Sequence, residues 1–373
     1  MKKIGIATIT FTKNKDVDFN YGNILQNYAL TKFLQKNNYY VETIYYIPTY
    51  IESLLKKSNK KEKRKFDQWI DDAKRVIKRK ITAKRLNEKK NIRREKFDKF
   101  IENNIKYSST EYEATSDFST LKNKYDFFIT GSDQVWNPYF EGSNEFYYLG
   151  FAPKEKRIAY APSIAVNMIP NELRNQLGEW IKGINDVSIR EHETQKMLRE
   201  EYGINSKLVC DPVFLLDISE WLEKSKCIEK SENYFLVYIL GKKTVEMKKN
   251  IARLEKVFGV KALDVYNRDD VNSCFAGPEE FLGLINNAKF ILTNSFHGMA
   301  FSIIFRKDFI LLNREGSRDM NSRILNLLEL IDKRNRSVQY ILDNPDMLHD
   351  KYTTEKLDEL INESKKFLLK KLS

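Results

Sequence analysis

One histidine stands in a segment whose residue types could bind an anion and move a proton. His297 lies in the stretch 289–305, KFILTNSFHGMAFSIIF, where a short apolar β-type run precedes a polar turn and a helix with an apolar face. Asn294 or Ser295 can cap that helix, whose free N–H groups then attract a phosphate or carboxylate. Histidine titrates near neutrality. The alternative is that Asn294 and Ser295 only cap the helix and His297 is a satisfied turn residue.

A second group of polar residues follows another apolar run. Residues 125–130, YDFFIT, are typical of a buried strand and lead into GSDQVWNP. Residues just past the carboxyl ends of parallel strands line the ligand crevice of open α/β sheets. Ser132, Asp133 and Gln134 would place a hydroxyl, a carboxylate and an amide there, which suit sugar hydroxyls. They could also simply cap the following turn, and the stretch lacks the lysine of a P-loop.

Two further positions have the same kind of placement. Arg190 ends the strand-type segment 186–190, DVSIR, where it is either a salt-bridged surface residue or an anion-binding residue. Near the start of the chain, Gly22 would permit close backbone approach and Asn23 would open a helix. This Gly-Asn pair does not match the dinucleotide fingerprint, which needs three spaced glycines.

The elements that must position these residues alternate strand and helix in both halves of the chain. Expected strands cover residues 4–10, 41–47, 125–130, 158–161, 186–190, 207–210, 234–240, 261–266, 290–292 and 309–313. Expected helices cover residues 23–35, 171–182, 193–202, 245–258, 278–287, 324–331 and 354–372. This alternation predicts an α/β fold with two Rossmann-like domains, each an open parallel sheet. We expect an amino-terminal domain over 1–212, a carboxyl-terminal domain over 213–345 and a last helix over 346–373 that packs back.

Composition is that of a folded protein with two domains. The 373 residues are 42% hydrophobic and 13% aromatic. The start, MKKIGIATITF, looks like a first strand rather than a leader, and no stretch approaches about 18 consecutive apolar residues. Three scattered cysteines suit a reducing cytosol, and three dispersed histidines do not suggest a metal site.

The positive charge is concentrated in one segment. The net charge is +12, and residues 56–99 alone hold 20 basic against 7 acidic residues. Apolar residues recur at helical spacing over 66–81, including Phe66 and Trp69, which predicts an amphipathic basic helix, and 97–105 continues as a second helix. This insert over 56–105 either docks on anionic lipid or packs its apolar stripe on its own domain or a partner subunit and solvates its charges.

Four segments together resemble the polysaccharide pyruvyl transferase family. They are YGNILQNYAL, YDFFITGSDQVWNP, SIREHETQKML with the downstream CDPVFLL, and TNSFHGMAFSIIF leading to SRILNLLELI. The resemblance covers about 330 residues and depends on the order and spacing of the four. It implies a two-domain architecture similar to GT-B glycosyltransferases, with the domains facing across a cleft. It also implies transfer of a pyruvyl group from phosphoenolpyruvate to two sugar hydroxyls, which forms a cyclic ketal and releases phosphate.

The resemblance places the family's histidine on His297 and its arginine on Arg190. We expect His297 to act as general acid or phosphate partner, Arg190 to bind the donor and Asp133 to act as base. Further donor-side residues are expected at Asn294, Ser295, Phe296, Arg314 and Arg318, with Arg323 another candidate. Acceptor-side residues are expected at Gly22, Asn23, Gln26, Ser132 and Gln134. The expected partners are phosphoenolpyruvate as donor substrate and a cell-surface glycan or its lipid-linked precursor; no cofactor and no metal are expected.

Two other function classes compete with this interpretation. A nucleotide-sugar glycosyltransferase would share the fold, although no obvious glutamate for a ribose follows His297. A non-catalytic nucleic-acid-binding protein would suit the basic charge, but the basic residues occupy one insert with few aromatics between them, so we expect no nucleic acid partner. The expected location is cytoplasmic, with the basic insert lying on the inner face of the membrane if it docks there.

Overall fold

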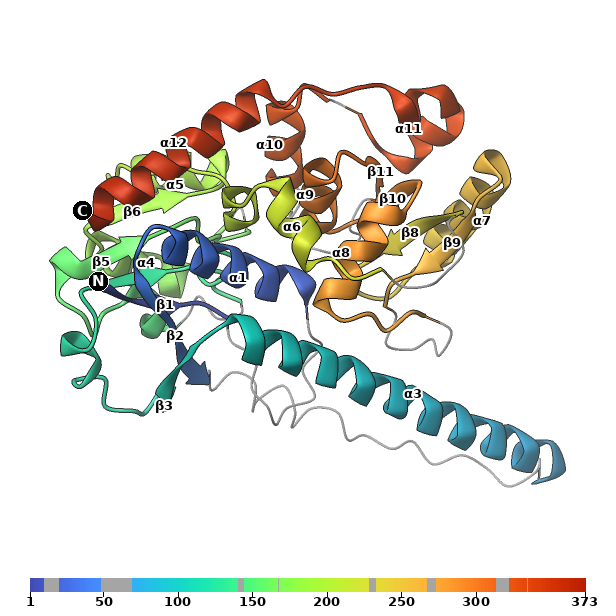
Figure 1. The fold of residues 1–373 in the computed structure, drawn as a ribbon, viewed down its shortest axis with the longest axis horizontal. Helices are drawn as coiled ribbons and strands as arrows, with labels where there is room; N and C mark the ends of the chain where they lie inside the picture. The colour runs from blue at the N-terminus through green and yellow to red at the C-terminus, as the bar shows by residue number, and fades with distance from the viewer. Residues whose placement is uncertain are drawn as a thin grey trace.

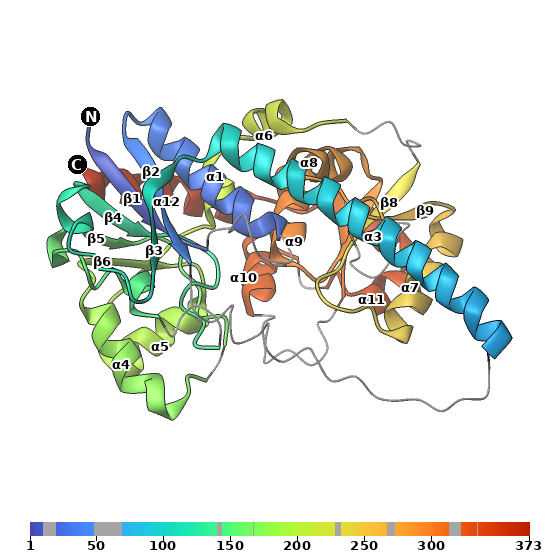
Figure 2. The ribbon, with the colours of Figure 1, turned by 90° about the horizontal axis from the view of Figure 1, so that it is seen from below.

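Two parallel β-sheets with helices packed against them make up the chain (Figures 1 and 2). The computed structural model describes residues 1–9, 20–47, 69–139, 144–166, 168–227, 233–266, 273–312, 322–333 and 335–373, of which 69–82 and 322 are described by backbone alone. The predicted α/β class with two parallel sheets is confirmed. The division into domains at residues 212 and 345 stays a prediction.

The first sheet has seven strands in the order β3-β2-β1-β4-β5-β6-β7. They are β1 Lys3–Ala7, β2 Tyr40–Ile47, β3 Tyr107–Glu113, β4 Phe127–Thr130, β5 Arg157–Ala159, β6 Asp186–Ile189 and β7 Lys207–Leu208. All pairs are parallel, so the carboxyl ends of these strands lie at one edge. Strand β3 was not predicted, because its sequence, YSSTEYE, is largely polar and pairs only at the edge of the sheet.

The second sheet has four strands in the order β11-β10-β8-β9. They are β8 Tyr234–Tyr238, β9 Lys261–Asp264, β10 Phe290–Thr293 and β11 Asp308–Leu311. Strand β10 is central and fully buried, as its apolar sequence FILT predicts. The turn after β10 is therefore held by a strand with neighbours on both sides.

Helices cover the faces of both sheets. They are α1 Tyr21–Lys36, α4 Asn171–Lys182, α5 His192–Tyr202, α6 Ile218–Lys224, α7 Val245–Phe258, α8 Pro278–Asn287, α9 Phe296–Ile304, α10 Ser322–Leu330, α11 Val338–Asp343 and α12 Glu355–Leu372. The sequence suggested that Asn23 opens α1, and this was wrong. The cap is Asn20, whose side chain accepts the Gly22 N–H at 2.9 Å.

The basic insert forms one long helix, α3 Trp69–Asn104, where two helices were predicted. Its carboxyl-terminal part packs on the protein, with Phe97 buried. The buried Arg93 guanidinium lies over Tyr21 at 4.9 Å and over Tyr266 at 3.9 Å. Tyr21 begins α1 and Tyr266 follows β9, so α3 bridges segments from both sheets (Figure 2). In this part of α3 the apolar stripe packs on its own chain.

The last helix, α12, returns to the first sheet, and the two chain ends lie close together (Figure 1). Leu368 and Leu372 are fully buried. The Ser364 hydroxyl accepts the Cys210 N–H at 2.8 Å, and Lys2 Nζ donates to the Leu372 carbonyl at 3.0 Å. Helix α12 thus supports the loop that follows β7. None of the helices in the described part of the chain has the length and apolar character needed to cross a membrane.

Candidate functional site

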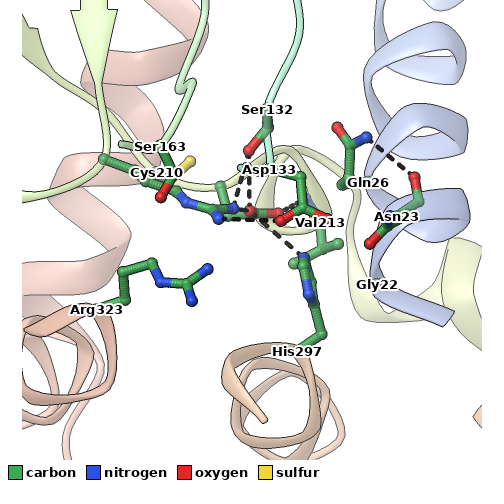
Figure 3. A network of polar contacts seen from close by, with 12 residues as sticks. Gly22, Asn23, Gln26, Ser132, Asp133, Ser163, Cys210, Val213, His297 and Arg323 are labelled. Carbon is green, nitrogen blue, oxygen red and sulfur yellow. Dashed lines mark hydrogen bonds and ion pairs between the residues drawn. The ribbon is translucent and has the colours of Figure 1, made fainter. Parts of the chain in front are cut away.

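Polar residues from four strand ends meet in one buried cluster (Figure 3). Ser132 and Asp133 follow β4, Arg190 follows β6, Asp211 follows β7, and His297 lies in the first turn of α9 after β10. Figure 3 shows His297 pointing from its helix toward Ser132 and Asp133. The strand ends of the first sheet thus face a strand end of the second, which is where the ligand crevice of parallel α/β sheets is expected.

The Arg190 guanidinium is the centre of this cluster. Its side chain is 2% exposed, and Nη1 donates to Ser132 Oγ at 2.9 Å and to the Asp211 carboxylate. Asp133 Oδ1 lies 3.6 Å from Nη2 and Glu191 Oε1 lies 4.0 Å from Nε. Burial alone would lower the pKa of Arg190, but Asp211, Asp133 and Glu191 raise it above its usual value. Arg190 is therefore a permanent cation inside the protein.

One edge of the guanidinium is not used by hydrogen bonds. Arg190 Nε and Nη2 are buried and have no hydrogen-bond partner among the described residues. These two nitrogens form the side of the guanidinium that binds carboxylates and phosphates in a bidentate manner. The Phe296 ring covers the guanidinium, with its centroid 4.9 Å from Cζ. Two buried donors without hydrogen bonds are costly, and the carboxylates near them lie only at ion-pair distance, so this edge is a candidate place for an oxyanion.

Asp211 holds the cluster together from the end of β7. Its side chain is 0% exposed. Oδ1 accepts the Val213 N–H at 3.1 Å, and Oδ2 accepts from Ser132 Oγ at 3.1 Å and from Arg190. Burial alone would raise the pKa of this carboxyl, but Arg190 and His297 beside it hold the pKa well below the usual 3.8. Asp211 is therefore ionised at neutral pH.

His297 is fixed between Asp211 and the start of α1. Ser295 caps α9 by accepting the Gly298 N–H at 3.4 Å, which places His297 in the first turn. His297 Nε2 lies 3.6 Å from Asp211 Oδ2, and the residue is 4% exposed. On the other side of the ring, a Cβ built on Gly22 would lie 2.0 Å from His297 Nδ1. Only glycine leaves room for the imidazole at this point of α1.

Replacing Gly22 with alanine is expected to displace the His297 ring. The added methyl cannot coexist with the ring at 2.0 Å, so one of the two must move. We expect the free energy of unfolding to fall by about 1–3 kcal/mol, as in other overpacked interiors. Urea unfolding measures this loss, and the NMR signal of the His297 ring should shift. The control is Lys32→Ala on the exposed side of α1; equal stability of both variants would contradict the contact.

Asp133 has an unusual backbone conformation. Its φ of +72° lies in the left-handed region, which aspartate tolerates better than most residues. The Asp133 carbonyl accepts the Ser163 N–H at 2.8 Å, and Oδ1 accepts the Gln134 N–H at 2.9 Å. The carboxylate is thereby held on the Nη2 side of Arg190. Backbone strain of this kind is found at functional sites.

Glu191 and Arg323 extend the cluster toward α10. Glu191, 2% exposed, accepts from Ser163 Oγ and from Thr194 Oγ1, the latter at 2.8 Å. Arg323 Nε, from the second half of the chain, lies 3.8 Å from Glu191 Oε1. The structure therefore brings Arg323 to the cluster, and its donor-side role stays a prediction. Glu191 and Asp211 were not predicted as site residues, although both directly follow strand segments.

The remaining donor-side residues have different surroundings. The Asn294 side chain accepts the Leu240 N–H at 2.7 Å and donates to the Leu240 carbonyl at 3.0 Å, so it ties the end of β8 to β10. Ser295 is the cap of α9. Arg314 and Arg318 lie outside the described residues. A donor-binding role for Asn294 stays a prediction, with its polar groups already engaged by the backbone.

The acceptor-side residues lie on α1 and after β4. Figure 3 places Gly22, Asn23 and Gln26 along the start of α1, beside His297. Gln26 is fully buried and donates to Thr8 Oγ1 and to the Asn23 carbonyl, both at 3.0 Å, while its Oε1 has no hydrogen-bond partner in the described chain. Gln134 accepts from Asn137 at 2.8 Å. Gly22 contacts His297, which was not anticipated from its predicted acceptor role.

Solved structures of several enzymes align with most of the chain at low identity. UDP-GlcNAc 2-epimerase from Methanocaldococcus jannaschii aligns with 12% identity and a TM-score of 0.49, covering 94% of this chain and 95% of the other. MurG from Acinetobacter baumannii aligns with 10% identity and a TM-score of 0.40, covering 98% and 94%. Glycosyltransferase SsfS6 from Streptomyces sp. SF2575 aligns with 9% identity and a TM-score of 0.44, covering all of both chains. These similarities say nothing about activity.

Sequence comparison gives a sharper result. No curated protein sequence matches the chain. The family model for polysaccharide pyruvyl transferases matches residues 20–316, which include the start of α1 and every residue of the cluster from Ser132 to His297. The match covers well over half of the chain and confirms the resemblance drawn from four short segments. The chain belongs to the polysaccharide pyruvyl transferase family.

Proposed function

We propose that this protein transfers the pyruvyl group of phosphoenolpyruvate to two hydroxyls of a sugar, forming a ketal and releasing phosphate. The acceptor in this proposal is a cell-surface polysaccharide or its lipid-linked precursor. One observation carries it: a buried arginine with an unused bidentate edge faces a histidine at a helix start, across strand ends of two sheets. A donor with a carboxylate and a phosphate needs two such anion partners.

The donor site would use the free edge of Arg190 and the amino-terminal end of α9. Nε and Nη2 of Arg190 would bind one anionic group side-on, with Phe296 covering the guanidinium. The helix end at Ser295 and Phe296, with His297, would bind the other. Arg323, beside Glu191, adds a second cation on the donor side. Arg314 and Arg318 keep their predicted donor-side role.

The proposed reaction has two bond-forming steps at the central carbon of the donor. A general acid first protonates the enol methylene, which gives that carbon oxocarbenium character, and one sugar hydroxyl adds to it as its proton passes to a base. The second hydroxyl then attacks the same carbon while the bond to the phosphate oxygen breaks, and phosphate leaves with the proton of this hydroxyl. In this proposal His297 serves as the acid and Asp133 as the base. Gly22, Asn23, Gln26, Ser132 and Gln134 would line the acceptor side.

The reaction can be tested directly with the purified chain. Incubation with phosphoenolpyruvate and a panel of free and lipid-linked glycosides should release phosphate only when the correct acceptor is present. Mass spectrometry should then find one ketal-linked pyruvyl group on that acceptor. Phosphate release without acceptor modification would indicate mere hydrolysis. A nucleotide sugar that is consumed instead of phosphoenolpyruvate would overturn the proposal in favour of a glycosyltransferase.

The basic insert supplies a proposed attachment to the membrane. Lys84, Arg85 and Lys99 are exposed on α3, and segment 56–99 carries 20 basic against 7 acidic residues. Because α3 packs on the protein around Arg93, the part of the insert that precedes Arg93 would be the one that docks on the membrane. Sedimentation with anionic vesicles at low salt decides the question, since only membrane docking predicts co-sedimentation that high salt reverses.

A further inference from the structure

A single carboxylate oxygen joins the two halves of the site. Asp211 Oδ2 accepts hydrogen bonds from Arg190 Nη1 and Ser132 Oγ and lies 3.6 Å from His297 Nε2. Arg190 and Ser132 come from strand ends of the first sheet, and His297 comes from the helix after β10 of the second. Asp133 and Glu191 approach Arg190 no closer than 3.6 Å and 4.0 Å. Glu191 also contacts both halves, through Arg190 and Arg323, but Asp211 is the carboxylate that contacts both Arg190 and His297.

Its effect on Arg190 is to select one orientation of the guanidinium. Because Nη1 is engaged by Asp211 and Ser132, Nε and Nη2 remain without hydrogen bonds to the described residues, on the edge suited to side-on binding of an oxyanion. Without the carboxylate, Ser132 alone would hold Nη1, and the guanidinium could move closer to Asp133 and Glu191, which already lie 3.6 Å from Nη2 and 4.0 Å from Nε. The free edge would then no longer be held in place.

Its effect on His297 is to fix the ring from the side opposite Gly22. The start of α1 leaves no space beyond Nδ1, and the Asp211 carboxylate lies 3.6 Å beyond Nε2. Side chains that orient a functional histidine in this way are commonly carboxylates. Asp211 is itself held, since Oδ1 accepts the Val213 N–H at 3.1 Å. The imidazole from the second half of the chain therefore has one position, which two groups of the first half define.

We propose that Asp211 is the positioning residue of this site, which orients Arg190 and His297 together on one buried oxygen. The inference rests on the proposed pyruvyl transfer. It assigns Asp211 no contact with the substrate. Its removal should therefore act through Arg190 and His297, and its effect should depend on whether His297 is present.

Asp211→Asn is the informative variant because it keeps the size of the side chain. Asparagine has one oxygen, so it can accept from Val213 or from Arg190 and Ser132, but not from both sides. We expect kcat/KM for phosphoenolpyruvate to fall by about 100-fold, with kcat affected more than KM, as found for residues that orient functional groups. In a His297→Asn background the same substitution should cost less than about tenfold, because coupled residues are not additive. Asp346→Asn, on the exposed surface, is the control.

Each outcome has a defined meaning. An Asp211→Asn enzyme with wild-type kinetics, or a loss of the same size with and without His297, would overturn the inference. Should this variant fail to fold by circular dichroism, Ser132→Ala takes its place: it removes the hydrogen bond to Asp211 Oδ2 and the one from Arg190 Nη1 without changing any charge. It should lower kcat/KM, again less in the His297→Asn background. An equal loss of kcat/KM in both backgrounds would contradict the inference. If the wild-type chain forms no ketal, the proposed function fails, which is a distinct result.

Discussion

Arg190→Ala is expected to abolish turnover and to lower the free energy of unfolding by about 3–5 kcal/mol, the usual cost of removing one partner from a buried ionic cluster. Asp133, Asp211 and Glu191 all lie within 4.0 Å of this guanidinium, and Asp211 is completely buried. Removal of Arg190 would leave these carboxylates without the cation at their centre. The same substitution removes the edge proposed to bind the donor.

The loss of stability in Arg190→Ala should depend on pH in a defined direction. In the wild-type protein the pKa of Asp211 is lowered below 3.8, so its contribution to stability is complete above that pH and is lost as the pH falls through the lowered pKa. Without Arg190, burial becomes the dominant influence and raises the pKa of Asp211. The free energy of unfolding of the variant is therefore lowered most at neutral pH, where folding must bury an ionised carboxylate. The difference in unfolding free energy between the two proteins should therefore shrink from pH 7 to pH 4.

Urea unfolding at several pH values measures both effects. The matched control is Arg174→Ala, which breaks a surface pair of Arg174 Nε with Glu201 Oε2 at 3.4 Å, both partners being more than a third exposed. Such a pair contributes about 0–1 kcal/mol, so its loss should change the free energy of unfolding little at any of these pH values. If Arg190→Ala were as stable as the control, the buried cluster would not have the energetic role assigned to it.

Much of the site was predictable because parallel sheets place the carboxyl ends of their strands at one edge. Ser132, Asp133 and Arg190 each directly follow an apolar run, and the structure brings them within hydrogen-bonding or ion-pairing distance of one another. His297 follows the apolar run of the second sheet and faces the same cluster. The roles of these residues stay predictions, but their proximity follows from local sequence and one rule of topology.

Asp211 was missed although it obeys the same rule. It follows β7 and precedes Pro212, and the sequence suggested only that this segment closes the first half of the chain. Nothing local shows that β7 ends opposite α9 of the other sheet. That juxtaposition is set by the packing of the two sheets through their helices, including the stacking of Tyr21 in α1 on Phe281 in α8 at 4.1 Å. Contacts between two sheets are therefore the part that periodicity does not reveal.

The sequence predicted two helices in place of the long helix α3 for a related reason. Residues 69–104 contain neither glycine nor proline, so nothing in the backbone ends the helix. The apolar spacing fades between residues 84 and 96, where charged residues dominate. The packing position there is filled by Arg93, whose guanidinium lies 4.5 Å from the Phe97 ring and 3.9 Å from the Tyr266 ring. A cation packed on aromatic rings replaces the apolar residue that a pattern search expects.

His297→Asn is expected to lower kcat by about 10²–10⁴-fold while changing KM for phosphoenolpyruvate by less than about tenfold. Asparagine keeps a hydrogen-bond donor near Asp211 and the start of α9, so it can still contact a phosphate. It cannot give up a proton at neutral pH. The substitution therefore separates the two roles expected for His297, since a general acid is lost and a phosphate partner is largely retained.

Steady-state kinetics of phosphate release with a fixed acceptor distinguish the two roles of His297. His192→Asn is the matched control, because His192 lies exposed at the start of α5 and should keep wild-type kcat and KM. A rise in KM with unchanged kcat would show that His297 only binds the donor phosphate. A loss confined to kcat would support proton donation by His297, because a residue that only binds the donor would change KM instead.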